Sequence, residues 1–287
     1  MSMRRRDFLK LPAAAVAAAA CRAERNTMND PPRSRMPVLF VSHGAPTLAL
    51  DTAAGADFAR LATALPRPDA LLAVSAHWLD APATIGTRAP RPLLYDFGGF
   101  APELYRVRYA APAAAELADE LQRDLPDLAR ADERPWDHGV WVPLVHMYPA
   151  ADVPLLQLSL PYAWSPNQLF ELGRRLAPLR DKNVLVFASG GAVHNLGAIE
   201  WRGEAPPPSW ATDFEAWLRD RLGRGANDDL IAFRERAPAL RRAHPTDEHL
   251  LPLLVAAGAA APHGGDVTFP IEGFEYGSLS RLAVRFG

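Results

Sequence analysis

The chain has 287 residues, 49% of them hydrophobic and 22% charged, so it can bury the core of one large domain or two small ones. Its formal net charge of -2 at pH 7 excludes the basic balance typical of nucleic-acid-binding proteins, and no basic run with interleaved aromatics occurs. The single cysteine excludes a disulfide framework within the chain.

The N-terminal segment has the pattern of an export signal. Basic residues in "MRRRDFLK" (3–10) precede the small apolar residues of "LPAAAVAAAAC" (11–21), which is typical of a secretory signal and too short to span a membrane. Arg5 and Arg6, followed by Asp-Phe-Leu-Lys, resemble a twin-arginine signal. We therefore predict export to the periplasm.

A lipid anchor is a further expectation for this segment. Cys21 directly follows the alanine run, at the place of a bacterial lipidation site, although the usual leucine is absent before it. Residues 22–35 are polar and contain two prolines, so we assign 1–35 to an export signal and tether. The alternative is translation from Met36, which would give a cytoplasmic product.

The remainder of the chain alternates apolar strand patterns with helical patterns. No internal repeat and no proline-rich linker divides residues 36–287. Such alternation is typical of an α/β fold, so we predict one domain with a largely buried, mixed or parallel central sheet flanked by helices. The predicted elements, in chain order, are a strand at 38–41, a helix at 55–65, strands at 70–76 and 83–89, an aromatic loop at 95–105, a helix at 113–125, a strand at 152–160, a helix at 166–179, a strand running into a glycine pair and a histidine over 183–196, helices at about 209–222, 227–236 and 247–257, and a hairpin or two short strands over 267–286.

Three histidines share one position relative to the predicted sheet. His43, His77 and His194 each lie just past the end of a buried strand pattern. Ligands of open α/β sheets bind beyond the carboxyl ends of the strands. If these strands are parallel neighbours, the three imidazoles converge at one edge of the sheet, which predicts a metal site.

Two further histidines lie at predicted helix starts. His138 begins a helical pattern in "WDHGVWVPL", and His249 follows Glu248 in "HPTDEHLLPLL". In the second segment Thr246 or Asp247 can cap a helix that carries Glu248 and His249 in its first turn. Both side chains are candidate ligands, and the choice depends on which helix face meets the site.

The other histidines have more ordinary settings. His244 precedes a proline and is interpreted as a turn residue, His146 as a core residue or a neighbour of the site, and His263 as an exposed loop residue. Asp137 and Asn195 are candidates for orienting the metal-binding imidazoles.

Several catalytic motifs are absent from the sequence. It contains no HExxH pair, no CxxC pair, no glycine-rich phosphate loop and no Gly-x-Ser-x-Gly elbow. What remains is a site rich in histidine and poor in oxygen ligands. Imidazoles suit Fe(II), Zn(II), Cu or Ni better than Mg or Ca, and an open coordination position admits substrate or O2.

Seven segments in one order resemble a known family. The chain is similar, over nearly all of 36–287, to the class III extradiol ring-cleavage dioxygenases of the LigB superfamily, and most of all to their DOPA 4,5-dioxygenase-like branch. The segments that carry this resemblance are "SHGAP", "SAHW", "DFGGFAPELY", "DHGVWVPL", "SGGAVHNL", "PTDEHLLPLL" and "GSLSRLAV".

The resemblance implies roles for individual residues. His43, His77 and His249 would be metal ligands, with Glu248 as a minor alternative because protocatechuate-cleaving relatives use a glutamate. His194 would be the acid/base or, as in zinc-bound members of the family, a fourth ligand. His138 would position substrate and dioxygen.

The resemblance also implies an activity. We expect an Fe(II)-dependent extradiol dioxygenase that opens the ring of a catechol-type, DOPA-like aromatic diol with O2 as co-substrate. Tyr95, Phe97 and Phe100 would form an aromatic substrate wall, unless they serve only packing. The alternative is a zinc-binding relative on the same fold that acts as a hydrolase or a non-catalytic binding protein. No pattern indicates an oligomeric state.

Overall fold

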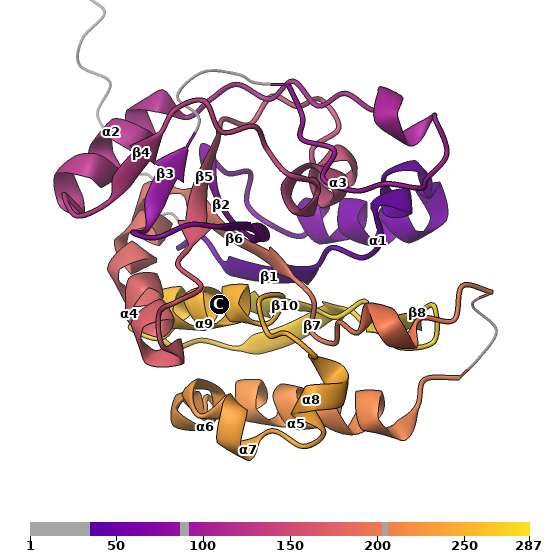
Figure 1. Ribbon diagram of the computed structural model, residues 1–287. Coiled ribbons are helices and arrows are strands. Elements are labelled where there is room, and N and C mark those ends of the chain that lie inside the picture. Colours follow the sequence, from indigo (N-terminus) through magenta and orange to yellow (C-terminus); the bar gives the residue numbers. More distant parts are fainter. Residues whose placement is uncertain (1–34, 87–91, 203–205) are drawn as a thin grey trace, which may run out of the picture. The chain divides into compact units, whose positions relative to one another are not determined.

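The computed structural model describes residues 35–86, 92–202 and 206–287 (Figure 1). The predicted export segment therefore lies outside the described residues except for its last residue. The strands are β1 (Val38–Ser42), β2 (Ala70–Leu79), β3 (Thr84–Gly86), β4 (Ala129–Ala131), β5 (Leu155–Leu160), β6 (Val184–Gly190), β7 (Val267–Ile271), β8 (Phe274–Glu275), β9 (Leu279–Ser280) and β10 (Ala283–Phe286). The α-helices are α1 (Thr52–Thr63), α2 (Ala115–Asp124), α3 (His138–Met147), α4 (Pro166–Leu176), α5 (Ser209–Gly223), α6 (Asn227–Ile231), α7 (Phe233–Arg236), α8 (Leu240–Ala243) and α9 (Leu251–Ala260).

The α/β prediction is confirmed by a mixed central sheet. Within the described residues, eight strands form it in the order β4-β3-β5-β2-β6-β1-β10-β7. The four strands β5, β2, β6 and β1 are mutually parallel, whereas β10 runs antiparallel to β1 and β3 antiparallel to β5. The carboxyl ends of the four parallel strands therefore share one edge of the sheet.

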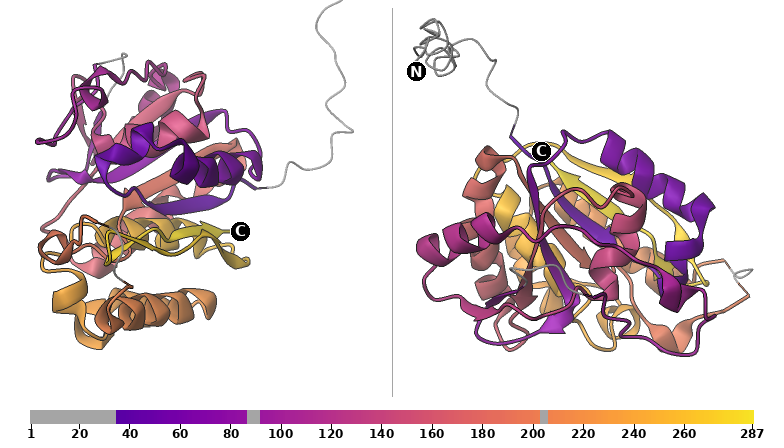
Figure 2. Two further views of the ribbon diagram at one scale, coloured as in Figure 1. Left: turned by 90° about the vertical axis from the view of Figure 1, so that its right-hand side faces the viewer. Right: turned by 90° about the horizontal axis from the view of Figure 1, so that it is seen from above.

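The strands are apolar on both sides because helices cover both faces of the sheet. Along β1, Val38 and Phe40 belong to one hydrophobic core and Leu39 and Val41 to the other. Helices α2, α4 and α9 pack on the first core, and α1 and α3 pack on the second (Figures 1 and 2). Successive side chains of a strand point to opposite faces, which explains the continuous apolar run.

Several element boundaries differ from the prediction. Strand β2 continues to Leu79, so His77 lies inside a longer strand, in the stretch where pairing with β5 is irregular. Helix α9 begins at Leu251 rather than near 247, because Pro252 is tolerated only in the first turn of a helix. His249 therefore lies in the turn before this helix.

Two more differences concern length. The helix predicted at 227–236 is two short helices, α6 and α7, and the strand predicted at 83–89 is described only as β3, because residues 87–91 lie outside the described residues. Within the described part of the chain, no helix combines the length and the apolar character needed to cross a membrane.

Candidate metal centre

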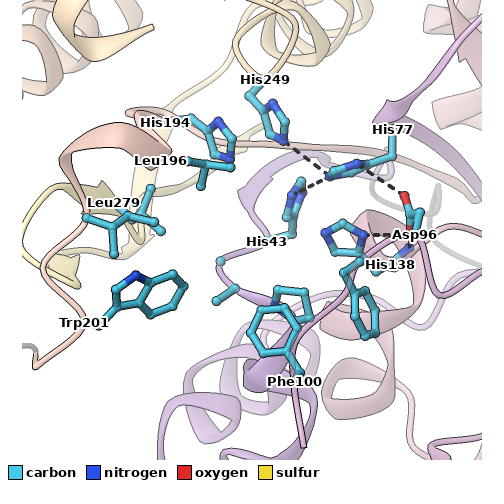
Figure 3. A pocket seen from close by; sticks show the side chains of 15 residues that line it. His43, His77, Asp96, Phe100, His138, His194, Leu196, Trp201, His249 and Leu279 are labelled. Carbon is cyan, nitrogen blue, oxygen red and sulfur yellow. Dashed lines mark hydrogen bonds and ion pairs between the residues drawn. The ribbon is translucent and has the colours of Figure 1, made fainter. Parts of the chain in front are cut away.

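Three imidazoles converge at the carboxyl edge of the parallel strands (Figure 3). His77 Nε2 lies 3.1 Å from His43 Nε2 and 3.3 Å from His249 Nε2. His43 directly follows β1, His77 is on β2, and His249 comes from the turn before α9. The side-chain nitrogens of all three lie within 4.8 Å of one another, as a shared metal ion requires.

The other ring nitrogen of each of these histidines faces an oxygen. His43 Nδ1 lies 2.9 Å from Ser189 Oγ, and this hydroxyl donates its hydrogen to the carbonyl oxygen of Gly139, so Ser189 must accept from His43. His249 Nδ1 lies 2.9 Å from Glu248 Oε1, and His77 Nδ1 lies 3.4 Å from a carboxylate oxygen of Asp96.

These partners fix the tautomer of the imidazoles. A nitrogen that donates to an oxygen carries the ring hydrogen, so the Nε2 atoms that face one another carry lone pairs. Three lone pairs aimed at one small space repel one another unless a cation lies between them. The donor set therefore fits a divalent transition metal, and the oxygen partners are of the kind that orient metal-binding histidines.

Burial keeps the three imidazoles neutral. It lowers the pKa of His77 to about 3, with the neighbouring His138 adding to the effect, and it lowers the pKa of His43 and His249 well below the ordinary 6.5. A positive charge on one of these rings would also make it harder to protonate the neighbouring rings. Neutral imidazoles are the form that binds metals.

The turn that carries His249 is held against the end of β6. The backbone N–H of Gly191 donates to the carbonyl oxygen of His249 at 2.9 Å. A Cβ atom on Gly190 would lie only 2.1 Å from that oxygen, so only glycine permits this close approach. Glu248, the alternative ligand, is engaged instead with the Nδ1 atom of His249.

His138 stands beside the three imidazoles, at the first residue of α3. Asp96 accepts from its backbone N–H at 3.1 Å, and the same carboxylate oxygen lies 2.8 Å from His138 Nδ1. Burial alone would raise the pKa of Asp96, but the hydrogen bonds from His138 and the electrostatic influence of the neighbouring His138 and His77 outweigh it and lower that pKa. An ionised Asp96 thus links His138 to His77.

His194 lies flat against His249 on the other side of the centre. Their ring centroids are 3.5 Å apart and their planes are inclined by only 6°. The lone pairs of an imidazole lie in its ring plane, so the lone pairs of two stacked rings do not converge on one point. Burial lowers the pKa of His194 to about 4, which leaves a neutral imidazole on the wall of the cavity.

A cavity of about 350 Å³ opens beside these histidines. His43, His77, His138, His194 and His249 all line it, so the structure brings together the five histidines that the sequence singled out. Phe97 and Phe100 line it as well, in an edge-to-face contact with centroids 5.6 Å apart. Its volume suits a small aromatic molecule.

Tyr95, the third residue of the expected aromatic wall, lies elsewhere. Its ring packs behind Phe97, and its hydroxyl donates to the carbonyl oxygen of Val107 at 2.6 Å and accepts from Arg108. Because this hydroxyl is engaged away from the cavity, the structure assigns Tyr95 to packing. It anchors the loop that carries Asp96 and Phe97.

The expected orienting residues have other partners. Asp137 accepts from Ser75 and Gln157, and the side-chain amide of Asn195 donates to the carbonyl oxygen of Arg242. Ser189, Asp96 and Glu248 face the imidazoles instead. The remaining histidines lie outside the cavity: His146 contacts the carbonyl oxygen of Leu48, His244 is buried against Ala192, and His263 is exposed.

Several residues of the site were missed by reasoning from the sequence, among them Ser189, Asp96 and Trp201. Asp96 lies between Tyr95 and Phe97 in the aromatic loop, and an acidic residue in this loop was a signal that the sequence contained. Trp201 also lines the cavity, although 62% of its surface is exposed, and it packs on Tyr276 with centroids 5.2 Å apart. No local pattern marks Trp201, because its place depends on distant segments.

Known proteins are similar to this chain in sequence and in fold. Residues 38–287 match the family described as the catalytic LigB subunit of aromatic ring-opening dioxygenase. A 4,5-DOPA dioxygenase extradiol of Escherichia coli K12 is 39% identical over 265 residues, which cover 88% of this chain and 96% of that protein. A protein of the same name from Beta vulgaris is 36% identical, over 77% of this chain and 85% of its own.

A solved structure agrees with these matches. The crystal structure of an uncharacterized protein from Escherichia coli K12 superposes with a TM-score of 0.73 at 35% identity, covering 88% of this chain and all of that one. The chain therefore belongs to the LigB family of aromatic ring-opening dioxygenases, in its DOPA-dioxygenase-like branch.

Proposed function

We propose that this enzyme is a metal-dependent extradiol dioxygenase that opens the ring of a catechol-type aromatic with O2. One divalent metal would be held by His43, His77 and His249. The observation that carries the proposal is the convergence of their three Nε2 atoms while each Nδ1 faces an oxygen. A cavity lined by aromatic residues adjoins this point.

The metal proposed for the ring-opening reaction is Fe(II). When bound, it supplies Lewis-acid binding of the two catechol oxygens and a route for electrons from the ring to dioxygen. The ring carbon–carbon bond beside the diol breaks, and both atoms of O2 enter the ring-opened product. This balance requires no nucleophile from the protein, consistent with the absence of a nucleophile motif from the sequence.

His194 is proposed as the acid/base rather than a fourth ligand. Its ring is stacked on His249, so its nitrogens point in a plane beside the metal ligands instead of toward their common point. It lines the cavity, where it can take a proton from a catechol hydroxyl and return it to the product.

His138 is proposed to hold the reacting oxygens. Asp96 accepts from its Nδ1, so the opposite nitrogen is left to contact substrate or dioxygen. Phe97, packed edge-on against the ring of His138 with centroids 5.5 Å apart, and Phe100 would hold the aromatic ring of the substrate.

The metal-loaded enzyme tests this function directly. Protein reconstituted with Fe(II) without oxygen is mixed with a panel of catechols, including DOPA, while O2 uptake and ring-opened product are recorded. We expect turnover in the wild type, and for His43→Ala a loss of both metal content and turnover. An iron-loaded protein that consumes no catechol would sink the proposal.

A second candidate follows from the donor set. Three histidines with an open position are also typical of catalytic zinc, so a zinc-binding relative acting as a hydrolase or as a binding protein is the alternative. Zinc that stays bound, with no ring opening after iron reconstitution, would favour it.

We also propose that the enzyme is exported by the twin-arginine route, with Cys21 as a site of lipid attachment. The support is the sequence pattern of Arg5 and Arg6 before the alanine run, together with a family match that begins only at residue 38. Replacing both arginines with lysine should retain the protein in the cytoplasm on cell fractionation. Unchanged fractionation would contradict the export signal.

A further inference from the structure

The cavity wall beyond the histidines is apolar. Among the described residues that line it, only the five histidines, Asp96 and the indole of Trp201 have side chains that can form a hydrogen bond. Neither lysine nor arginine is among them (Figure 3). The larger side chains of this wall are Phe97, Phe100, Leu196, Ile199, Trp201 and Leu279.

Three carboxyl groups lie at the cavity or close behind its wall, and each has a partner. Asp96 is engaged by His138 and His77, and Glu248 by His249. Glu275 accepts from the backbone N–H of Ala45 at 3.1 Å, behind the cavity wall. A carboxylate on a substrate would therefore meet acidic neighbours and no cationic side chain among the described residues that line the cavity.

Polar groups further out are also engaged with one another. The hydroxyl groups of Thr47 and Tyr276 lie 3.3 Å apart, and the indole of Trp201 packs on the ring of Tyr276. Together with Leu196 and Leu279, the indole makes this part of the cavity wall largely apolar. A charged substituent packed against this wall would lose part of its hydration without gaining a partner among the described lining residues, which is unfavourable.

We propose that the ring substituent of the preferred catechol is uncharged and apolar, so that alkyl- or aryl-substituted catechols are better substrates than the amino acid DOPA. This inference rests on the proposed function and narrows its substrate class. The cavity of about 350 Å³ has room for one aromatic ring and a short substituent.

A matched set of substrates separates charge from size. The set comprises catechol, 4-methylcatechol, 4-ethylcatechol and 4-propylcatechol, with 3-(3,4-dihydroxyphenyl)propanoate as the anion, dopamine as the cation and DOPA as the zwitterion. We expect kcat/KM to rise by up to about fourfold for each buried methylene group. The propanoate and DOPA should each be at least about tenfold poorer than 4-propylcatechol.

Binding provides a readout that does not depend on turnover. Calorimetric titration of the zinc-loaded protein with the same compounds should give the same order of dissociation constants. If DOPA or the propanoate binds and reacts as well as 4-propylcatechol, the inference fails while the proposed function stands. If no catechol is consumed after iron reconstitution, the proposed function itself fails.

A substitution on the wall tests whether a cation among the lining residues would change the preference. Leu196 is 62% exposed and lines the cavity, so Leu196→Arg places a guanidinium there at little cost to folding. We expect the ratio of kcat/KM for the propanoate to that for 4-propylcatechol to rise at least about tenfold. Leu196→Gln, polar but uncharged, is the matched control and should shift the ratio far less. An unchanged ratio in Leu196→Arg, or an equal shift in both variants, would contradict the inference.

Discussion

The five histidines of the centre differ in what their second ring nitrogen contacts. For His43, His77 and His249 that contact is an oxygen, which turns the remaining lone pair toward a common point. His138 also contacts a carboxylate, but it lies to one side, and His194 is stacked on His249. The orientation of each ring, rather than its residue type, therefore decides which imidazoles can share a metal.

Replacing His194 separates metal binding from catalysis. His194→Phe keeps a flat ring against His249 but removes the group proposed to move a proton. We expect metal content close to wild type and a kcat lower by about 10²- to 10⁴-fold, the range typical of general acid–base catalysis. Metal analysis and O2 uptake on the same preparation provide the measurement. Full activity would contradict the acid/base role, and loss of metal would instead indicate a ligand.

At this scale the sequence predicted which histidines come together but not their side-chain partners. His43, His77 and His194 could be found because each follows a buried strand pattern. Asp137 and Asn195 were expected to orient the imidazoles because they are neighbours in sequence, yet the partners are Ser189, Asp96 and Glu248. Side-chain partners of a site depend on which segments meet in space, and proximity along the chain is a poor guide to that.

Among the secondary-structure elements, the end of β6 organises the site. Its Ser189 accepts from His43, and its terminal glycine lets the turn of His249 approach. The backbone N–H of His43 also donates to the carbonyl oxygen of Gly190 at 3.0 Å, which extends the pairing of β1 with β6. Two of the three converging histidines are thus placed by one strand end.

Gly190→Ala should disturb this arrangement. Its Cβ atom would lie 2.1 Å from the carbonyl oxygen of His249, so the turn that carries His249 must move. We expect the protein to lose about 1–3 kcal/mol of stability, as for other overpacked sites, and to bind metal more weakly. Gly223→Ala is the matched control, since a Cβ there meets open space. Denaturant unfolding and zinc titration would show the difference, and wild-type zinc affinity in Gly190→Ala would contradict the placement of this turn.

The alternation of strands and helices was predictable, whereas the order of the strands was not. Apolar runs such as β1 and β6 mark buried strands locally, but the order β5-β2-β6-β1-β10 depends on pairing between segments far apart in the chain. The predicted start of α9 was wrong because the prediction gave the capping pattern at Thr246 and Asp247 more weight than Pro252. Proline restricts a helix more strongly than a cap favours it.

For the molecule as a whole, buried histidines make stability depend on pH. The pKa values of His43, His77, His194, His244 and His249 are all lowered, chiefly by burial. The unfolded chain takes up protons on these residues as pH falls through about 6.5, while the folded chain does not, so acid favours unfolding. Asp137 and Glu215, which are buried, and the half-buried Glu275 have pKa values raised mainly by desolvation, and they act in the opposite direction.

His244 allows the contribution of one buried histidine that does not line the cavity to be tested. Only 2% of the surface of His244 is exposed. Its Nε2 atom donates to the carbonyl oxygen of Ala192 at 3.0 Å, and its Nδ1 atom has no hydrogen-bond partner among the described residues. Burial lowers its pKa to about 4. Stability from this residue is therefore complete above pH 6.5 and is lost as pH falls toward 4.

His244→Gln keeps a donor for Ala192 but cannot titrate. Between pH 7 and pH 4 we expect the free energy of unfolding to fall by on the order of 3 kcal/mol more in the wild type than in this variant. Urea unfolding at several pH values, with a chelator present in both proteins, removes the separate pH dependence of metal binding. The change in the free energy of unfolding that the substitution itself causes is measured at pH 7, where His244 is mainly neutral in both the folded and the unfolded protein. Curves that stay parallel from pH 7 to pH 4 would show that the folded protein takes up a proton on His244 as readily as the unfolded chain does.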